Sequence, residues 1–272
     1  MNARAEIEQL QRSTGHARAA FARSQGRAAL RVLAQTGSAK AIILPGPGDH
    51  AEAVFLNTSG GLTGGDRLDY ALELDPGCRV TATTQTAERI YRSSGGQARI
   101  GVTAQVGAGA HLDWLPQETI LFDRAAALRR TRIDLAPDAT CLMAETLVLG
   151  RAAMGERVAQ VDFTDRRELR RGGVPLHLEI VRLTDAALIA GAAGLAGARA
   201  VASVVLAAPG AGDALGPVRA ALGMEGVRGA ASALAGRLVV RLMAADAWPL
   251  RRQMMRLLDL LRRAPLPRVW HC

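Results

Sequence analysis

Three turn signals recur at a nearly constant spacing along the middle of the chain, and this spacing constrains the fold more than any other feature. They are Asp75-Pro76-Gly77, Gly107-Ala108-Gly109 and Ala136-Pro137-Asp138, separated by 32 and then 29 residues. A comparable strand-like segment follows each turn. A period near thirty predicts β-coils stacked on one another, each of which hides its apolar face against the next. A sandwich with evenly spaced hairpins is the alternative that this pattern leaves open.

The segments beside these turns alternate between apolar and polar residues. Residues 98–106 place Ala98, Ile100, Val102, Ala104 and Val106 on one face, which is typical of a half-buried strand. Similar short segments cover residues 70–74, 79–83, 131–135, 158–163 and 176–183. The middle of the chain is therefore predicted to be β.

The C-terminal part has a different pattern. Its apolar residues form one helical stripe, which consists of Leu250, Met254, Leu257, Leu258 and Leu261. Asp246 can cap this helix and Pro265 ends it. The opposite face carries Arg251, Arg252, Arg256 and Arg263, interpreted as a solvated face or a partner contact. A shorter helix is predicted at 217–222 and a strand at 237–243.

These patterns predict a mainly β fold of stacked β-coil (β-helix-like) sheets, with two α-helices in the C-terminal part. We expect one domain over residues 1–272, with a β-rich core at about 15–205 and a C-terminal α/β portion at about 206–272.

Charge and composition bear on the partners. The net charge is +9 and Lys40 is the only lysine, so arginine carries the excess, which favours an acidic partner. Aromatic residues make up only 3% of the chain, which disfavours a base-stacking nucleic-acid platform. Nucleic acid is the less favoured alternative.

The sequence also bears on location. Cys78, Cys141 and Cys272 form no C-x-x-C pair, which is typical of reduced thiols in the cytoplasm. Met1 to Leu10 has no apolar core of a secretory signal, and no run of 18 apolar residues occurs. The Ala/Gly-rich stretch 186–198 is interpreted as loop and strand. We expect a cytoplasmic protein without a membrane span.

The sequence contains no recognisable catalytic centre. In the glycine-rich segment 57–67, Asp66 and Arg67 stand where a Walker phosphate loop needs Lys and Ser/Thr, so a tight bend that ends in Asp66 is the better interpretation. The five histidines show no metal-ligand spacing, and the terminal His271-Cys272 pair is interpreted as a frayed tail rather than a soft-metal site. The sequence therefore argues against an enzyme.

Three carboxylates stand out on physical grounds: Asp66, Glu145 and Glu179. Glu145 lies in an apolar run, where an unpaired charge is costly, so it needs a partner, a proton or a water-filled passage. Glu179 lies on a strand face opposite Leu178 and Ile180. Structural pairing with an arginine such as Arg151 or Arg182 is the alternative.

Five motifs, in the same order along the chain, resemble those of the UreD (also called UreH) family of urease accessory proteins. Residues 60–66 resemble its G-G-x-x-G-G-D signature and residues 84–93 its T-x-x-x-x-K-x-Y-R-S stretch, with Arg89 in place of the usual lysine. The segments 112–120, 149–156 and 266–270 follow the family order as well. The first fifty residues are only loosely similar.

The resemblance implies a non-enzymatic scaffold that helps insert nickel into apo-urease. It implies partners, namely UreF, the GTPase UreG (through UreF) and apo-urease, and no permanently bound cofactor, only transient Ni2+ that passes through the interior. By the same analogy, Asp66, Glu145 and Glu179 are candidate metal residues along that path, because weak oxygen ligands release an ion that a tight cage would trap. The alternatives are an unassigned β-solenoid enzyme and a basic β-solenoid protein that binds another acidic partner or nucleic acid.

Overall fold

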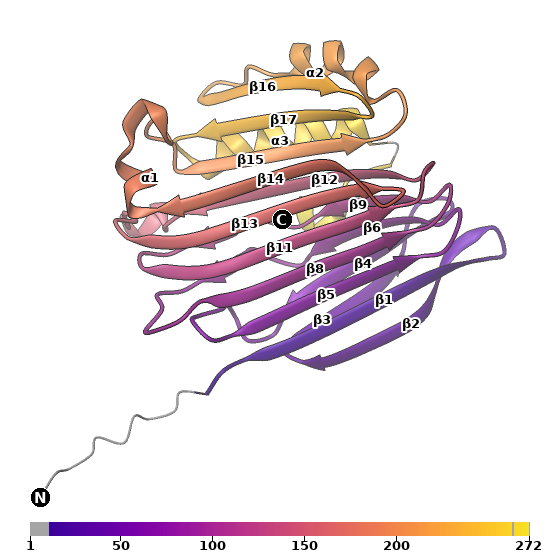
Figure 1. Cartoon of the computed structure of the whole chain (residues 1–272), viewed down its shortest axis with the longest axis horizontal. Coiled ribbons are helices and arrows are strands. Elements are labelled where there is room, and N and C mark those ends of the chain that lie inside the picture. Colours follow the sequence, from indigo (N-terminus) through magenta and orange to yellow (C-terminus); the bar gives the residue numbers. More distant parts are fainter. Residues whose placement is uncertain (1–10, 263, 272) are drawn as a thin grey trace, which may run out of the picture.

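Each of the three predicted turns carries the chain from one β-sheet into the other. The computed structural model describes residues 11–262 and 264–271 and places the two sheets, named A and B here, face to face (Figure 1). The turns join β5 to β6, β8 to β9 and β11 to β12, and in every case the first strand belongs to sheet A and the second to sheet B. The repeat in the sequence is therefore one coil of the stack.

Sheet A has seven strands. In spatial order they are β14 (Val174–Thr184), β13 (Val161–Arg171), β11 (Ala125–Leu135), β8 (Ala98–Val106), β5 (Arg67–Leu74), β1 (Thr14–Ser24) and β2 (Arg27–Gly37). The five strands from β13 to β1 pair in parallel, as stacked coils require, whereas hairpins would pair antiparallel. This pairing decides against the sandwich of hairpins.

Sheet B has ten strands. Its main path runs through β16 (Val227–Leu234), β17 (Arg237–Ala244), β15 (Ala200–Ala207), β12 (Thr140–Leu149), β9 (His111–Leu115), β6 (Arg79–Thr84), β4 (His50–Asn57) and β3 (Ala39–Pro45). The strands from β12 to β4 are parallel. Two short strands, β7 (Glu88–Ile90) and β10 (Thr119–Leu121), pair in parallel with each other and β10 pairs with the end of β12, so the coils also stack along a third, narrow side.

Helices cover the outer face of sheet B. The helix α3 (Ala247–Leu261) lies behind β15 and β17 in Figure 1 and contacts both, while α2 (Leu215–Ala221) packs beside β16. Asp246 caps α3 as predicted, because its Oδ1 accepts from the N–H of Trp248 at 2.8 Å. Four residues of the predicted stripe, Leu250, Met254, Leu257 and Leu258, are buried. Short 3-10 turns are present at 152–154, 191–193, 211–214 and 268–270.

Two apolar cores result. The larger lies between the sheets and includes Phe21, Phe55, Trp114 and Phe163, and the smaller lies between sheet B and the helices. The outcome confirms the mainly β, coil-like fold with two C-terminal helices. Among the described residues, no helix is long and apolar enough to cross a bilayer.

Three details differ from the sequence predictions. The stretch 186–198, expected to be loop and strand, begins inside a short helix, α1 (Asp185–Ile189), which Thr184 caps through the N–H of Ala187. The strand expected at 158–163 starts only at Val161. Arg251 is not on a solvated face, because its Nη1 donates to Gln117 Oε1 at 2.7 Å. Met1 to Leu10, Arg263 and Cys272 lie outside the described residues.

Candidate functional site

The glycine-rich segment is the predicted bend, and Asp66 stabilises it. The segment connects β4 to β5, and Gly60, Gly61 and Gly65 take positive φ values there, which a glycine adopts without strain. Asp66 is buried and accepts from two backbone N–H groups at 2.8 Å each, those of Ser13 on Oδ1 and Thr63 on Oδ2. Its carboxylate therefore closes the bend by hydrogen bonds to the backbone.

The first two family-like segments, 60–66 and 84–93, interlock. Leu62 pairs with Ile90 as an isolated parallel bridge, and the hydroxyl of Tyr91 donates to the carbonyl of Gly60 at 3.0 Å. A Cβ on Gly61 would lie 2.4 Å from the Tyr91 ring, and one on Gly64 would lie 2.1 Å from Ser93 Oγ. Glycine is required at both positions because the second segment occupies the space of a side chain.

Glu145 lies between the two sheets, where one carboxylate oxygen accepts a hydrogen bond and the other lies in an ion pair without a hydrogen bond. It is 1% exposed; Trp114 Nε1–H donates to its Oε1 at 2.9 Å, and Arg129 Nη1 lies 2.9 Å from its Oε2. Arg129 comes from β11 of sheet A and Glu145 from β12 of sheet B. The ion pair therefore crosses the interior and joins the two layers.

Glu179 is held by two arginines. Its Oε2 accepts from Arg167 Nη1 at 3.1 Å and its Oε1 from Arg241 Nε at 2.7 Å. Arg167 also donates from Nη1 to Ser203 Oγ at 2.6 Å and from Nε to Asp165 Oδ2 at 2.8 Å. Structural pairing is thus present, but with different arginines from Arg151 and Arg182, the partners suggested from the sequence.

Asp165 connects these two pairs into one chain of alternating charges. It is fully buried, and its carboxylate accepts from both Arg129 and Arg167. The complete chain runs Glu145, Arg129, Asp165, Arg167, Glu179, Arg241. We name these six residues the interior ion chain. It contains three acids and three arginines, so its charges balance, although two arginines are buried and Arg241 reaches Glu179 from the surface with 63% of its side chain exposed.

The charges in the interior ion chain are maintained by the arginines. Burial alone raises the pKa of Asp165, but the adjacent guanidinium groups of Arg129 and Arg167 outweigh this and hold the pKa below its usual value. The pKa of Glu179 is also lowered, because Arg167 and Arg241 outweigh the effect of its burial. Both carboxylates are therefore ionised at neutral pH.

The structure brings Glu145 and Glu179 together through the interior ion chain, whereas Asp66 is bound to the backbone of the glycine bend. Sequence reasoning missed Asp165, Arg129 and Arg167. The alternation along β13 was a signal that could have found two of them. Asp165 and Arg167 lie on the same buried face of this strand as Val161, Phe163 and Leu169. Charged residues at buried strand positions need partners, and this rule predicts an interior network.

A small cavity adjoins Glu145. It has a volume of about 30 Å³, enough for a water molecule, and its lining includes Glu88, Trp114, Gln117 and Glu145. The Nε2 of the buried Gln117 has no hydrogen-bond partner among the described residues, so a water molecule would satisfy it. Burial raises the pKa of Glu88 to about 7, despite the amide of Asn57 that donates to it.

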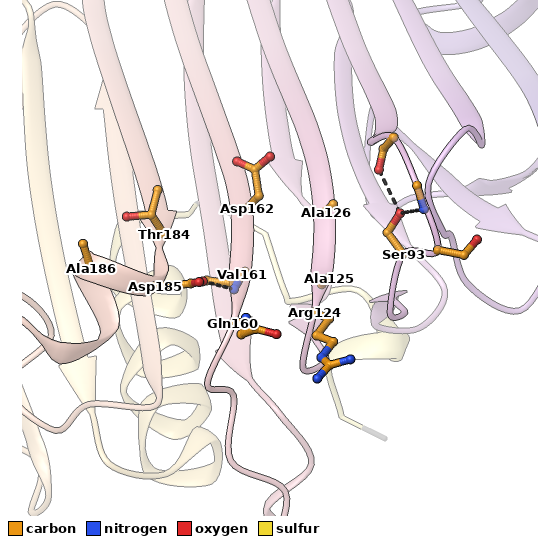
Figure 2. A pocket seen from close by; sticks show the side chains of 13 residues that line it. Ser93, Arg124, Ala125, Ala126, Gln160, Val161, Asp162, Thr184, Asp185 and Ala186 are labelled. Atoms are coloured by element: carbon orange, nitrogen blue, oxygen red, sulfur yellow. Dashed lines mark hydrogen bonds between the residues drawn. The ribbon is translucent and has the colours of Figure 1, made fainter.

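A surface groove of about 630 Å³ opens where β11, β13 and β14 meet their loops. Figure 2 shows Ser93, Arg124, Asp162 and Asp185 around it. Three of these groups are hydrogen-bonded within the chain: Ser93 Oγ bonds to Gly95 N and Gly96 O, Asp162 Oδ2 accepts from Gln97 Nε2 at 2.8 Å, and Asp185 Oδ1 accepts from Val161 N at 2.7 Å. No catalytic pair is assembled among the lining residues.

The potential metal ligands that the structure describes lie in residues 11–262 and 264–271. Within those ranges, no cluster of three or more His, Cys, Asp or Glu side chains is arranged to hold a metal ion. Cys78 and Cys141 are buried free thiols, and burial raises the pKa of both. Of the His271-Cys272 pair, the cysteine lies outside the described residues.

Comparison with known proteins relates the sequence of this chain to one family. Residues 13–271 match the family described as UreD urease accessory protein. The chain is similar to proteins named urease accessory protein UreD from Cereibacter sphaeroides strain ATCC 17025 (57% identical, 96% of each chain), Paracoccus denitrificans (52% identical, 91% of this chain and 92% of the relative) and Rhizobium leguminosarum bv. trifolii (47% identical, 96% of each chain).

Proposed function

Because this chain belongs to the UreD urease accessory protein family, we propose that it acts as a non-catalytic scaffold in urease maturation and assists nickel insertion into apo-urease. The observation that carries the proposal is the family match, which spans residues 13–271 and so covers both sheets and the helices. The word accessory in the relatives' names favours a role beside the enzyme rather than as one.

The proposed partners are UreF, the GTPase UreG, reached through UreF, and apo-urease, in the cytoplasm. A net charge of +9 supports the binding of acidic surfaces by long-range attraction. A rigid body of stacked coils supports a scaffold role, because each layer is fixed by backbone pairing to the next.

We propose further that Ni2+ in transit contacts the acids of the interior. The interior ion chain offers carboxylates from both sheets, and Asp66 lies at the end of the glycine bend. A passing ion has to displace Arg129 from Glu145, and Arg167 or Arg241 from Glu179. Structural pairing, the alternative that the sequence left open, has direct support from these contacts, and the passage role stays a prediction.

The scaffold proposal is tested by removing and restoring this chain in cells that express urease, UreF and UreG. Urease activity and nickel content should fall without the chain and return with it, and affinity capture of the chain should recover UreF and apo-urease. Full urease activation in its absence would contradict the proposal. Salt-sensitive DNA binding without capture of UreF would favour the nucleic-acid alternative instead.

A further inference from the structure

The edge strand β14 is inverted with respect to an ordinary surface strand. His177 and Glu179 point inward and are buried, whereas Leu178 and Ile180 point outward and are 50% and 55% exposed. Strands at the surface of soluble proteins normally point their apolar side chains toward the core and their charged side chains toward solvent. Here the inward acid serves the interior ion chain, and the outward apolar pair has no such role.

No apolar neighbour on sheet A covers this pair. Across the antiparallel pairing with β13, Ile180 stands opposite Arg166 and Leu178 opposite Glu168. On the other side β14 has no strand partner, because it is the last strand of sheet A. An unpaired edge with exposed apolar side chains is costly and prone to association, so its presence indicates a surface that becomes covered.

A groove runs beside this edge. It has a volume of about 460 Å³ and lies between β14 and the strands β15 and β17 of sheet B, with the chain turn around Leu195 at one end. Half-buried Val181, Val201 and Met243 line it together with Leu178 and Ile180. Figure 1 shows β14 and β15 side by side at the upper part of the stack.

Positive charge borders the apolar groove. Arg182 is exposed two residues beyond Ile180 on β14, whereas the charge of Arg241, which also lines the groove, is matched by Glu179. Glu179 itself is neutralised by two arginines. An occupant that is apolar and carries a carboxylate therefore matches the groove in both polarity and charge.

We propose that this groove is a docking site for an extended segment of a partner protein in urease maturation, whose apolar side chains cover Leu178 and Ile180 and whose carboxylate meets Arg182. The inference rests on the proposed function, because it assigns the surface by which the scaffold holds one of its partners. Strand addition to the free edge of β14 would supply backbone hydrogen bonds, and the side chains would supply specificity.

The test uses the full chain with purified UreF, UreG and apo-urease. Ile180→Asp should weaken the affinity for the docked partner by at least about tenfold, as expected for an apolar contact at the centre of an interface. Arg182→Glu should weaken it too and reduce its dependence on salt. The control is Met154→Asp, because Met154 is 72% exposed and lies in the 3-10 turn 152–154 rather than on an edge strand. The affinity of this variant should stay within about twofold of the wild type.

A photo-crosslinking side chain at Leu178 gives a second readout that does not depend on a disruptive change. A crosslink to UreF, UreG or a urease subunit supports the docking site, whereas a crosslink only to a second copy of this chain overturns it. If Ile180→Asp binds as the wild type does and urease is still activated, the docking site is wrong and the proposed function stands. If the wild-type chain itself fails to activate urease, the proposed function fails.

Discussion

Arg129 and Asp165 occupy the same register position on the parallel strands β11 and β13, and the guanidinium donates from Nε to Oδ1 of the carboxylate at 3.0 Å. The neighbouring strand pair repeats this arrangement, since Arg167 stands opposite Glu179 in the register of β13 and β14. On the facing sheet, Glu145, Ser203 and Arg241 form one row across β12, β15 and β17. Sheet A therefore contributes two register pairs, offset by two residues along β13, and sheet B contributes one row, and the two sets contact across the interior.

The first prediction concerns stability. Arg129→Met should lower the free energy of unfolding by about 3–5 kcal/mol, because it leaves Asp165 and Glu145 buried without their shared cation. Glu145→Gln should cost only about 1–2 kcal/mol, since the amide oxygen still accepts from Trp114. Urea unfolding of the two variants measures the difference. Equal losses for both would show that Arg129 is not the centre of the network.

The second prediction concerns nickel. Glu145→Gln and Glu179→Gln should lower the nickel content of urease while the complex with UreF still forms, because each removes a negative charge without changing the size of the side chain. The control is Glu73→Gln, which removes a carboxylate that Arg18 holds at the surface of sheet A. If all three variants load urease equally, or if the interior variants no longer assemble, the acids are structural only.

The third prediction concerns the glycine bend. Gly64→Ala should destabilise the fold by about 2–3 kcal/mol, because the new Cβ would meet Ser93 Oγ at 2.1 Å and the carbonyl of Gly95 at 2.3 Å. The control is Gly95→Ala. The carbonyl of Gly95 faces Gly64, but a Cβ added at Gly95 would lie in open space, so this change should alter stability by less than about 0.5 kcal/mol. Thermal unfolding of both variants measures the effect. A tolerated Gly64→Ala would show that the two segments can separate.

The fourth prediction concerns pH. Burial in the folded chain raises the pKa of Glu88 to about 7 from its ordinary 4.5. Between pH 4.5 and pH 7 the folded state therefore binds more protons than the unfolded state, and the stability of the fold decreases as the pH rises. Glu88→Gln should remove this loss and stabilise the protein at pH 8 by up to about 3 kcal/mol, since the two pKa values differ by about 2.5 and one unit corresponds to about 1.4 kcal/mol.

The comparison for Glu88→Gln is Glu73→Gln, which should lower the stability of the fold instead of raising it. The hydrogen bond from Arg18 lowers the pKa of Glu73, so its ionised form stabilises the fold above its unfolded pKa. Unfolding free energies at pH 5 and pH 8 test both variants. A Glu88→Gln protein with the same pH slope as the wild type would show that Glu88 is ionised in the fold at no cost.

The sequence by itself determined the local elements and their repetition. Alternation fixed strands such as β8, the turns at 75, 107 and 136 fixed the coil length, and the apolar stripe after Asp246 fixed α3. These features are local, because side-chain direction repeats every two residues in a strand and every 3.6 in a helix. The glycine bend also follows from its own sequence, and Asp66 closes it locally through Thr63, whereas the bond from Ser13 is a tertiary contact.

Only the tertiary structure decided which charges meet. Arg129 and Asp165 are 36 residues apart, and their contact depends on the register of β11 against β13, which no local pattern encodes. Glu145 reaches Arg129 only because the two sheets stack face to face. Alternation predicts that a charge points inward, but the identity of its partner depends on how whole coils align, because a shift of one residue would turn every side chain to the other face.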